Sequence, residues 1–245
     1  VVRCFDDADI THVEGSVDPI RDIEIINLEL IMADLQTIEN RLSKVERKAV
    51  TNKDKDAMAE VVVLKKLREA LEAGRPARSV ELDKDELALI KAFSLLTIKP
   101  MIYIANMSDE EIADPKENPY FQKVKELADS EHNEVVPICA KIEEELSELD
   151  KEEKLEFLNE LGIQESGLDK VIKTAYRILD LCTFLTAGED ECRAWTFHRG
   201  MLAPQCAGVI HTDFEKGFIR AECYKFEDID KLETEQAVKE AGKLR

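Results

Sequence analysis

Two short polar loops, each following an apolar run, carry side chains that could recognise a purine base. The first, Asn106-Met107-Ser108-Asp109, ends the run 100–106, and the second, Cys139-Ala140-Lys141, ends the run 135–140. The amide of Asn106 can donate and accept, so it can read a purine edge or tie neighbouring loops together. Met107 could cover the face of the base, and the small residues at 139 and 140 let backbone amides approach it. In the alternative interpretation, Asn106 caps a strand end and Cys139 is a core thiol.

The elements around these loops are expected to place them at one edge of a sheet. Continuously apolar runs such as 100–106 and 135–140 are typical of buried strands in a parallel sheet. Between them, Asn118-Pro119 opens a predicted helix that ends near Ser130, because proline suits the first helical turn. This order predicts a right-handed crossover unit, in which ligands bind at the carboxyl ends of the strands. Further helices are predicted over 143–149, 152–161 and 168–181.

A long helix that buries one narrow seam is predicted for the stretch 18–50. Its apolar residues recur every three or four positions, and they are Leu28, Ile31, Leu35, Ile38, Leu42 and Val45. After the polar stretch 51–56, a second helix ends near Gly74 and carries Val61, Leu64, Leu67 and Leu71. Together they predict an antiparallel hairpin, whose core packing needs no partner and whose tip at 51–56 is the better candidate for a docking contact. A third helix is predicted from Asp83, where Glu86 completes a capping box.

After Leu181 the chain changes to short β-rich runs, at 182–186, 193–197 and 218–224, which predict a small α+β module. Its basic residues are candidates for an RNA-facing surface, and they are Arg193, Arg199, Lys216 and Arg220. The aromatic residues Trp195, Phe214 and Phe218 lie near them in the sequence. In the alternative interpretation, the aromatic residues form the core of the module and the charged residues are merely solvated.

The composition is that of an acidic protein with enough apolar residues for packed cores. The chain has 245 residues, of which 44% are hydrophobic and 36% charged, with a net charge of −19. Such a chain does not attract nucleic acid through its overall field, so an RNA contact needs a local basic patch and DNA is not an expected partner. The six cysteines contain no C-x-x-C pair, so neither zinc nor a disulfide framework is indicated. No apolar run is long enough for a membrane span, and we expect a soluble, cytoplasmic protein.

Hydrolysis of a nucleotide needs a phosphate-binding loop, and the sequence contains no G-x-x-x-x-G-K-[ST] motif. The Gly242-Lys243 pair has Ala237 in the leading glycine position and Leu244 in place of Ser or Thr. No D-x-x-G segment precedes any glycine either. Because the chain begins inside the apolar run 1–5, as if a strand had been cut, we interpret it as a fragment whose phosphate and magnesium ligands lie upstream of Val1.

Four segments in the last third of the chain closely resemble the TGS domain of the YchF/Obg-like ATPases. They are 183–188 (TFLTAG), 193–196 (RAWT), 203–205 (APQ) and 210–221 (IHTDFEKGFIRA). The resemblance extends to 1–5, 27–45 and 103–106, so it covers essentially the whole chain, in a form closer to the bacterial members.

This resemblance implies a fold that combines α/β and α+β parts. Residues 1–17 and 99–181 would form the carboxyl-terminal part of a P-loop G-domain, and 18–98 a coiled-coil insertion. Residues 182–245 would form a β-grasp TGS domain, incomplete at its end. The family also implies ATP hydrolysis with Mg²⁺, association with the ribosome and its rRNA, and a role in translation or stress regulation.

The base-binding motif of the family can be carried onto the first loop. Most related GTPases specify guanine with N-K-x-D, whereas this family commonly has N-x-x-E. Here Asn106 is retained, Met107 replaces the lysine and Asp109 stands where glutamate is usual, with Cys139 and Ala140 closing the pocket. A carboxylate facing guanine meets two donors, so Asp109 is a departure that favours GTP, whereas the loss of the lysine favours ATP. The resemblance as a whole favours ATP.

No catalytic residue can be assigned, and we expect the chain alone to be inactive, because catalysis in this class is mostly positioning and charge stabilisation around the phosphates. The alternative hypothesis is a non-catalytic adaptor that binds the ribosome or RNA through the hairpin and the TGS-like module.

Overall fold

The computed structural model describes residues 1–11, 14–52, 54–188 and 191–245. These residues form two compact units, Val1–Ile178 and Leu179–Arg245.

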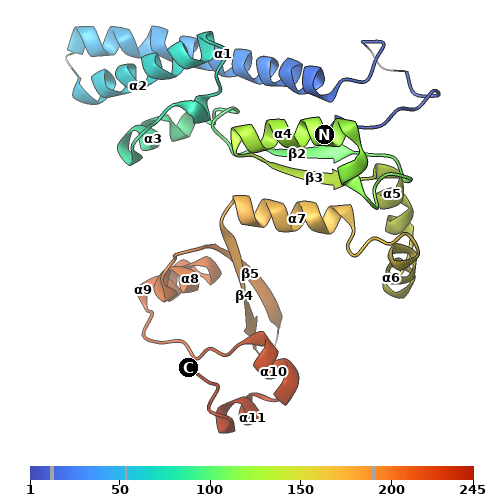
Figure 1. The fold of residues 1–245 in the computed structure, drawn as a ribbon. Coiled ribbons are helices and arrows are strands. Elements are labelled where there is room, and N and C mark those ends of the chain that lie inside the picture. Colours follow the sequence, from blue (N-terminus) through green and yellow to red (C-terminus); the bar gives the residue numbers. More distant parts are fainter. Residues whose placement is uncertain (12–13, 53, 189–190) are drawn as a thin grey trace. The chain divides into compact units, whose positions relative to one another are not determined.

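A three-stranded parallel sheet forms the centre of the first unit (Figure 1). Its strands are β1 (Val2–Arg3), β2 (Ile102–Asn106) and β3 (Glu134–Ile138), in the order β1-β2-β3. The crossover helix α4 (Pro119–Glu131) covers one face, and α7 (Gly167–Ile178) covers the other. After β3, α5 (Ala140–Glu148) and α6 (Lys151–Glu160) follow, and the short 3-10 helix η3 (Pro115–Glu117) precedes α4. The predicted parallel strands and the helix between them are confirmed.

Burial explains why these elements hold together. The side chains of Cys4, Ala105, Val124 and Ala128 are fully buried between the strands and α4. Asn118 caps α4 by accepting a hydrogen bond from the Phe121 backbone N–H at 2.8 Å. Its amide nitrogen donates to the Cys4 backbone oxygen at 2.9 Å, which ties the end of β1 to the start of α4. A buried side chain with both polar atoms satisfied in this way fixes the relative position of two elements.

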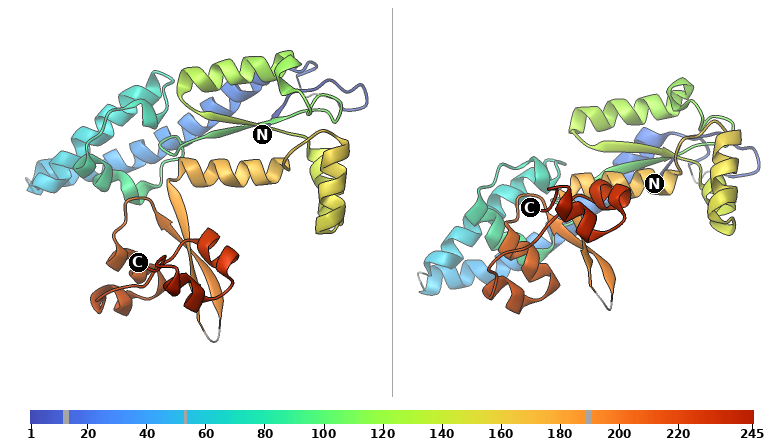
Figure 2. Two further views of the ribbon diagram at one scale, coloured as in Figure 1. Left: turned by 60° about the horizontal axis from the view of Figure 1, so that its bottom comes forward. Right: turned by 90° about the horizontal axis from the view of Figure 1, so that it is seen from below.

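Helices α1 (Pro19–Asn52) and α2 (Lys55–Glu72) pack side by side, as all the views show (Figure 2). Their shared seam includes Ile38, Leu42 and Leu64. Leu28, which was predicted in this seam, is 56% exposed. The 18 residues of α2 span only about 27 Å. They therefore cover one half of the 34-residue α1, and Leu28 lies in the other.

Polar contacts also join the two helices, and a capping box begins the third. Arg41 donates to both carboxylate oxygens of Glu60, at 2.5 and 2.8 Å.

Helix α3 (Lys84–Ile90) begins with the predicted capping box of Asp83 and Glu86. The 3-10 helices η1 (Ala77–Ser79) and η2 (Lys91–Phe93) flank α3. Of the polar tip at 51–56, α1 includes the first two residues, and Lys53 lies outside the described residues.

A buried carboxylate connects α1 to the segment that leads into β2. Asp34 is 2% exposed. Its Oδ1 accepts from the Leu96 N–H at 2.7 Å, and its Oδ2 accepts from the N–H and hydroxyl of Thr97, at 2.7 and 2.6 Å. The Thr97 hydroxyl in turn accepts from the Ala77 N–H at 2.9 Å. Three segments distant in sequence therefore meet at the Thr97 side chain.

The second unit contains a two-stranded antiparallel sheet, β4 (Leu181–Ala187) and β5 (Cys192–His198). Four helices follow, α8 (Ala203–Ile210), α9 (Thr212–Lys216), α10 (Phe226–Leu232) and α11 (Glu235–Glu240). The strand predicted at 218–224 is absent from the described structure, where this segment is irregular and Ile219 is 91% exposed. A strand needs a neighbouring strand to pair its backbone, and among the described residues only Cys223 of this segment is paired, with Arg245 at 2.9 and 3.0 Å. The β-grasp assignment stays a prediction.

Candidate nucleotide-base site

Both predicted loops lie at the carboxyl edge of the parallel sheet, on adjacent strands. Asn106 at the end of β2 is in register with Ile138 at the end of β3. One residue further on, the Met107 N–H donates to the Ile138 oxygen at 2.8 Å. The Asn106 side chain then bridges the loops, because its Oδ1 accepts from the Ala140 N–H at 3.0 Å. This leaves its Nδ2 group as a donor without a partner among the described residues, available to a ligand.

A second bridge between the loops is formed by Asp109 and Lys141, whose Oδ2 and Nζ atoms are 2.6 Å apart. Both side chains are exposed. The hydrogen bond from Lys141 lowers the pKa of the Asp109 carboxyl, helped by backbone N–H groups of its own loop. The same hydrogen bond raises the pKa of Lys141. The predicted site did not include Lys141. The available signal was its position directly after Ala140, as a lone basic residue in the acidic helix α5.

Met107 and Cys139 lie in the core instead of at the surface of the site, with 1% and 3% of their side chains exposed. The strand period explains the position of Met107. Tyr103, Ala105 and Met107 alternate along one face of β2 and its extension, and all three are buried, whereas Asn106 points to the other face. The Met107 side chain therefore does not cover a base in this structure. Cys139 occupies the place of a core thiol, which was the alternative interpretation.

Helix α7 is fixed against the second loop by a close contact at its first residue. Glu143 of α5 accepts from the backbone N–H of Gly167 at 2.6 Å and of Leu168 at 3.1 Å, so it serves as a distant cap. A Cβ atom at Gly167 would lie 2.8 Å from Cγ2 of Ile138. It would also lie 2.9 Å from Oε1 of Glu143, so a residue without a side chain is needed where these two side chains pack against the backbone of α7. The sequence-based prediction did not identify either residue as part of the support for the site.

The four basic residues proposed for RNA contact lie in different parts of the second unit. Arg193 is near the start of β5, with its guanidinium 4.3 Å from the ring centre of Trp195. Arg199 follows the end of β5 and pairs with Asp180 at 2.9 Å. At about 3.3 Å per residue the two arginines are about 20 Å apart along the strand. Lys216 ends α9, and Arg220 follows it in the irregular segment, so the four residues come from different elements of the unit.

The aromatic residues near them are not fully buried. Trp195 and Phe218 are half-buried, and Phe214 is 54% exposed. Trp195 donates to the Thr186 hydroxyl at 2.9 Å. The prediction that Trp195 and Phe218 form a core therefore holds only in part, because Val238 is the one fully buried apolar side chain among the described residues of this unit.

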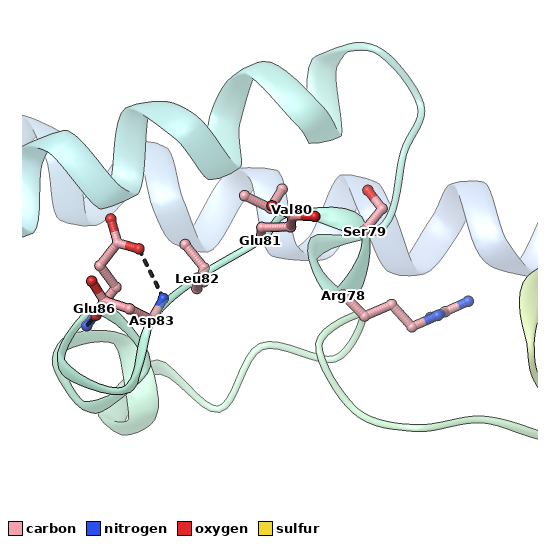
Figure 3. Close-up of a pocket in the computed structure, with 7 residues that line it drawn as sticks. All are labelled: Arg78, Ser79, Val80, Glu81, Leu82, Asp83 and Glu86. Atoms are coloured by element: carbon pink, nitrogen blue, oxygen red, sulfur yellow. Dashed lines mark hydrogen bonds between the residues drawn. The ribbon is translucent and has the colours of Figure 1, made fainter.

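A depression of about 610 Å³ lies on the helical part of the first unit. It is lined by residues 78–83 and by Glu86, around the turn between η1 and α3 (Figure 3). The hydrogen bond drawn there joins the Glu86 carboxylate to the Asp83 N–H, at 3.0 Å. Two of its acidic side chains, Asp83 and Glu86, therefore serve the capping box, and none of the predicted site residues lines it.

Within the part of the chain that the structure describes, no three side chains are grouped to hold a metal ion. The described helices include none that is long and apolar enough to cross a membrane.

A parallel sheet with helices on both faces and polar loops at its carboxyl edge defines an α/β protein of the kind that binds ligands at that edge. Comparison with known proteins gives the family. The chain is 55% identical to the ribosome-binding ATPase YchF of Bacillus subtilis over 245 residues, which is all of this chain and 67% of the relative. The YchF protein of Escherichia coli O157:H7 is 49% identical over the same length, which is 66% of that protein.

A solved structure agrees with these relatives. The YchF GTPase of Schizosaccharomyces pombe matches with a TM-score of 0.83 at 38% identity, over 99% of this chain and 65% of that one. Residues 181–245 match the family model YchF-GTPase_C, described as a protein of unknown function (DUF933). The chain belongs to the YchF family, as its sequence predicts, and it spans about two thirds of the length of these relatives.

Proposed function

We propose that the protein is a ribosome-associated ATPase and that the carboxyl edge of its parallel sheet binds the adenine base. The observation that carries this proposal is the bridge from Asn106 to the Ala140 N–H at 3.0 Å. It joins both edge loops and leaves the Asn106 Nδ2 group as a donor without a partner among the described residues. A purine offers N7 as an acceptor for such a donor. The relatives are described as ribosome-binding ATPases, and Mg²⁺ would accompany the phosphates.

Asn106 and Ala140 form the base-binding surface in this proposal, with Asp109 beside them. Met107 and Cys139 support it from the core. No catalytic residue is proposed. A cytoplasmic location follows from association with the ribosome, and neither DNA nor a membrane is a proposed partner.

Substitution of Asn106 tests the base site in the full-length gene product. Asn106→Ala removes both the bridge and the free donor, so we expect ATP to bind at least tenfold more weakly by isothermal titration calorimetry. Asn40→Ala, an exposed change on α1, is the matched control and should bind like the wild type. Unchanged affinity in Asn106→Ala would remove the base site from this edge.

We propose the second unit as the ribosome contact, with Arg193 and Lys216 as its strongest candidates. Lys216 forms no ion pair among the described residues, and Phe214 is exposed two positions before it. Arg193 and Trp195 present a cation stacked on an aromatic ring, which suits contact with bases and phosphates. Arg199 and Arg220 each have a carboxylate partner, Asp180 and Glu222, and would have to exchange it.

Charge reversal distinguishes these residues from merely solvated ones. Arg193→Glu with Lys216→Glu should lower co-sedimentation with ribosomes at least fivefold, more at low salt than at high salt, because salt screens these charges. Lys231→Glu on α10, combined with Lys225→Glu, is the control with the same change in charge. Equal co-sedimentation of both double variants would contradict the proposed contact.

A further inference from the structure

One oxygen of the Asp109 carboxylate is engaged by the protein itself. Its Oδ2 atom accepts from Lys141 Nζ at 2.6 Å. Backbone N–H groups of Asp109 and Glu110 also interact with the carboxylate. Lys141 comes from the second loop, 32 positions further along the chain. The acid that stands in the base-reading position of the first loop is therefore already paired with a residue of the second loop.

The engagement of this acid matters because the two purines differ at the edge that a carboxylate would read. Guanine presents two donors, N1–H and N2–H, which an unpaired carboxylate accepts together. Adenine presents one donor at N6 and an acceptor at N1, which repels a carboxylate oxygen. The N7 acceptor is common to both bases. A site with a free aspartate favours guanine. A site that recognises the base mainly through an amide donor to N7 does not favour guanine, because both purines have that acceptor.

We propose that Lys141 is a specificity-determining residue, which holds Asp109 away from the base and so removes the guanine preference that this aspartate would otherwise give. Asn106 Nδ2 then remains as the main base-reading donor. A guanine nucleotide has to break the bridge between Lys141 and Asp109 before it can use the carboxylate, whereas an adenine nucleotide does not. This inference rests on the proposed base site and explains how an aspartate is compatible with ATP.

The bridge can be removed without unfolding the protein. Both side chains are exposed, with 65% of Lys141 and 43% of Asp109 accessible. Exposed ion pairs contribute little to stability, because water solvates the separated charges well. A change in nucleotide preference after substitution of Lys141 would therefore report on the site and not on the fold.

The experiment measures the ratio of ATP to GTP affinity in the full-length gene product, by competition against a fluorescent nucleotide. In Lys141→Met we expect the ratio to shift at least fivefold towards GTP. The ratio is the right quantity, because loss of a positive charge weakens the binding of both triphosphates alike. Lys141→Arg can keep the bridge and should retain the wild-type ratio. Lys125→Met, an exposed change on α4, is the matched control.

A second substitution connects the effect to Asp109. Asp109→Asn in the wild-type background should leave the ratio within twofold, whereas in the Lys141→Met background it should abolish the shift. A Lys141→Met ratio within twofold of the wild type would overturn the inference while ATP binding itself upheld the base site. So would an equal loss of GTP affinity from Asp109→Asn in both backgrounds. If Asn106→Ala leaves ATP affinity unchanged, the base site fails and the inference fails with it.

Discussion

Replacing Asp34 by asparagine tests whether one buried carboxylate holds the helical part of the first unit together. The substitution keeps the size of the side chain but replaces one acceptor atom by an NH₂ group. The carboxylate accepts from two backbone N–H groups, one at each oxygen, at 2.7 Å in both cases. Whichever way the new amide is turned, its NH₂ group faces one of these donors.

The expected loss of stability follows from this geometry. A hydrogen bond to a charged acceptor contributes about 1.5–3 kcal/mol, and a buried donor left without a partner costs about 1–3 kcal/mol. Because Asp34 is nearly inaccessible to water, both terms apply, and we expect Asp34→Asn to lower the free energy of unfolding by about 3–5 kcal/mol. For a urea slope of about 3 kcal/mol per molar, the midpoint would fall by at least about 1 M.

Urea denaturation followed by far-ultraviolet circular dichroism measures this effect, because α1 and α2 are long and contribute strongly to the helical signal. Glu39→Gln is the control, since it makes the same chemical change at an exposed position of the same helix and should alter stability by less than about 0.5 kcal/mol. A double-mutant cycle with Thr97→Val should give a coupling of about 1–2 kcal/mol. A loss below about 1 kcal/mol for Asp34→Asn would refute the reasoning.

Three further predictions concern the sheet and the site. Gly167→Ala forces a Cβ atom to within 2.8 Å of Ile138, so it should destabilise the first unit by about 1–3 kcal/mol in the same denaturation assay. Burial raises the pKa of the Cys4 thiol to about 12, so mass spectrometry should show iodoacetamide modifying native Cys4 at pH 8 at least a hundredfold more slowly than the exposed thiols. The pKa of Asp109 is lowered mainly by Lys141, so the stability that this carboxylate contributes is present above its unfolded pKa and is lost as the pH falls through the lower folded value. Carbon-13 NMR titration should show that pKa rising towards its ordinary value in Lys141→Met.

Local sequence signals predicted the elements that carry the candidate site. The runs 100–106 and 135–140 are apolar almost throughout, and Asn118-Pro119 is a strong helix start, so the strand, helix and strand could be located from the sequence. The capping box of Asp83 and Glu86 was predicted for the same reason, because it depends on two residues three positions apart. These features are decided within a few residues of the chain.

Features that depend on distant partners were not predictable in the same way. The seam of α1 was extended too far, to Leu28, because the sequence of one helix does not show where its partner ends. The segment 218–224 has the composition of a strand, yet it lacks a neighbouring strand to pair with over most of its length. Continuous apolarity in β2 also hid which face Met107 would take, although the period of two places it with Tyr103 and Ala105.

The two aspartates show why a residue type in a loop does not by itself define a chemistry. Asp34 and Asp109 carry the same group, but every oxygen of Asp34 is used by backbone and hydroxyl donors inside the fold. Asp109 lies at the surface and is held by one lysine that water or a ligand can displace. The first is therefore a fixed structural contact, whereas the second is a reversible one, whose partner decides whether the carboxylate can meet a base. In the proposed base site, Lys141 therefore matters as much for nucleotide choice as the aspartate itself.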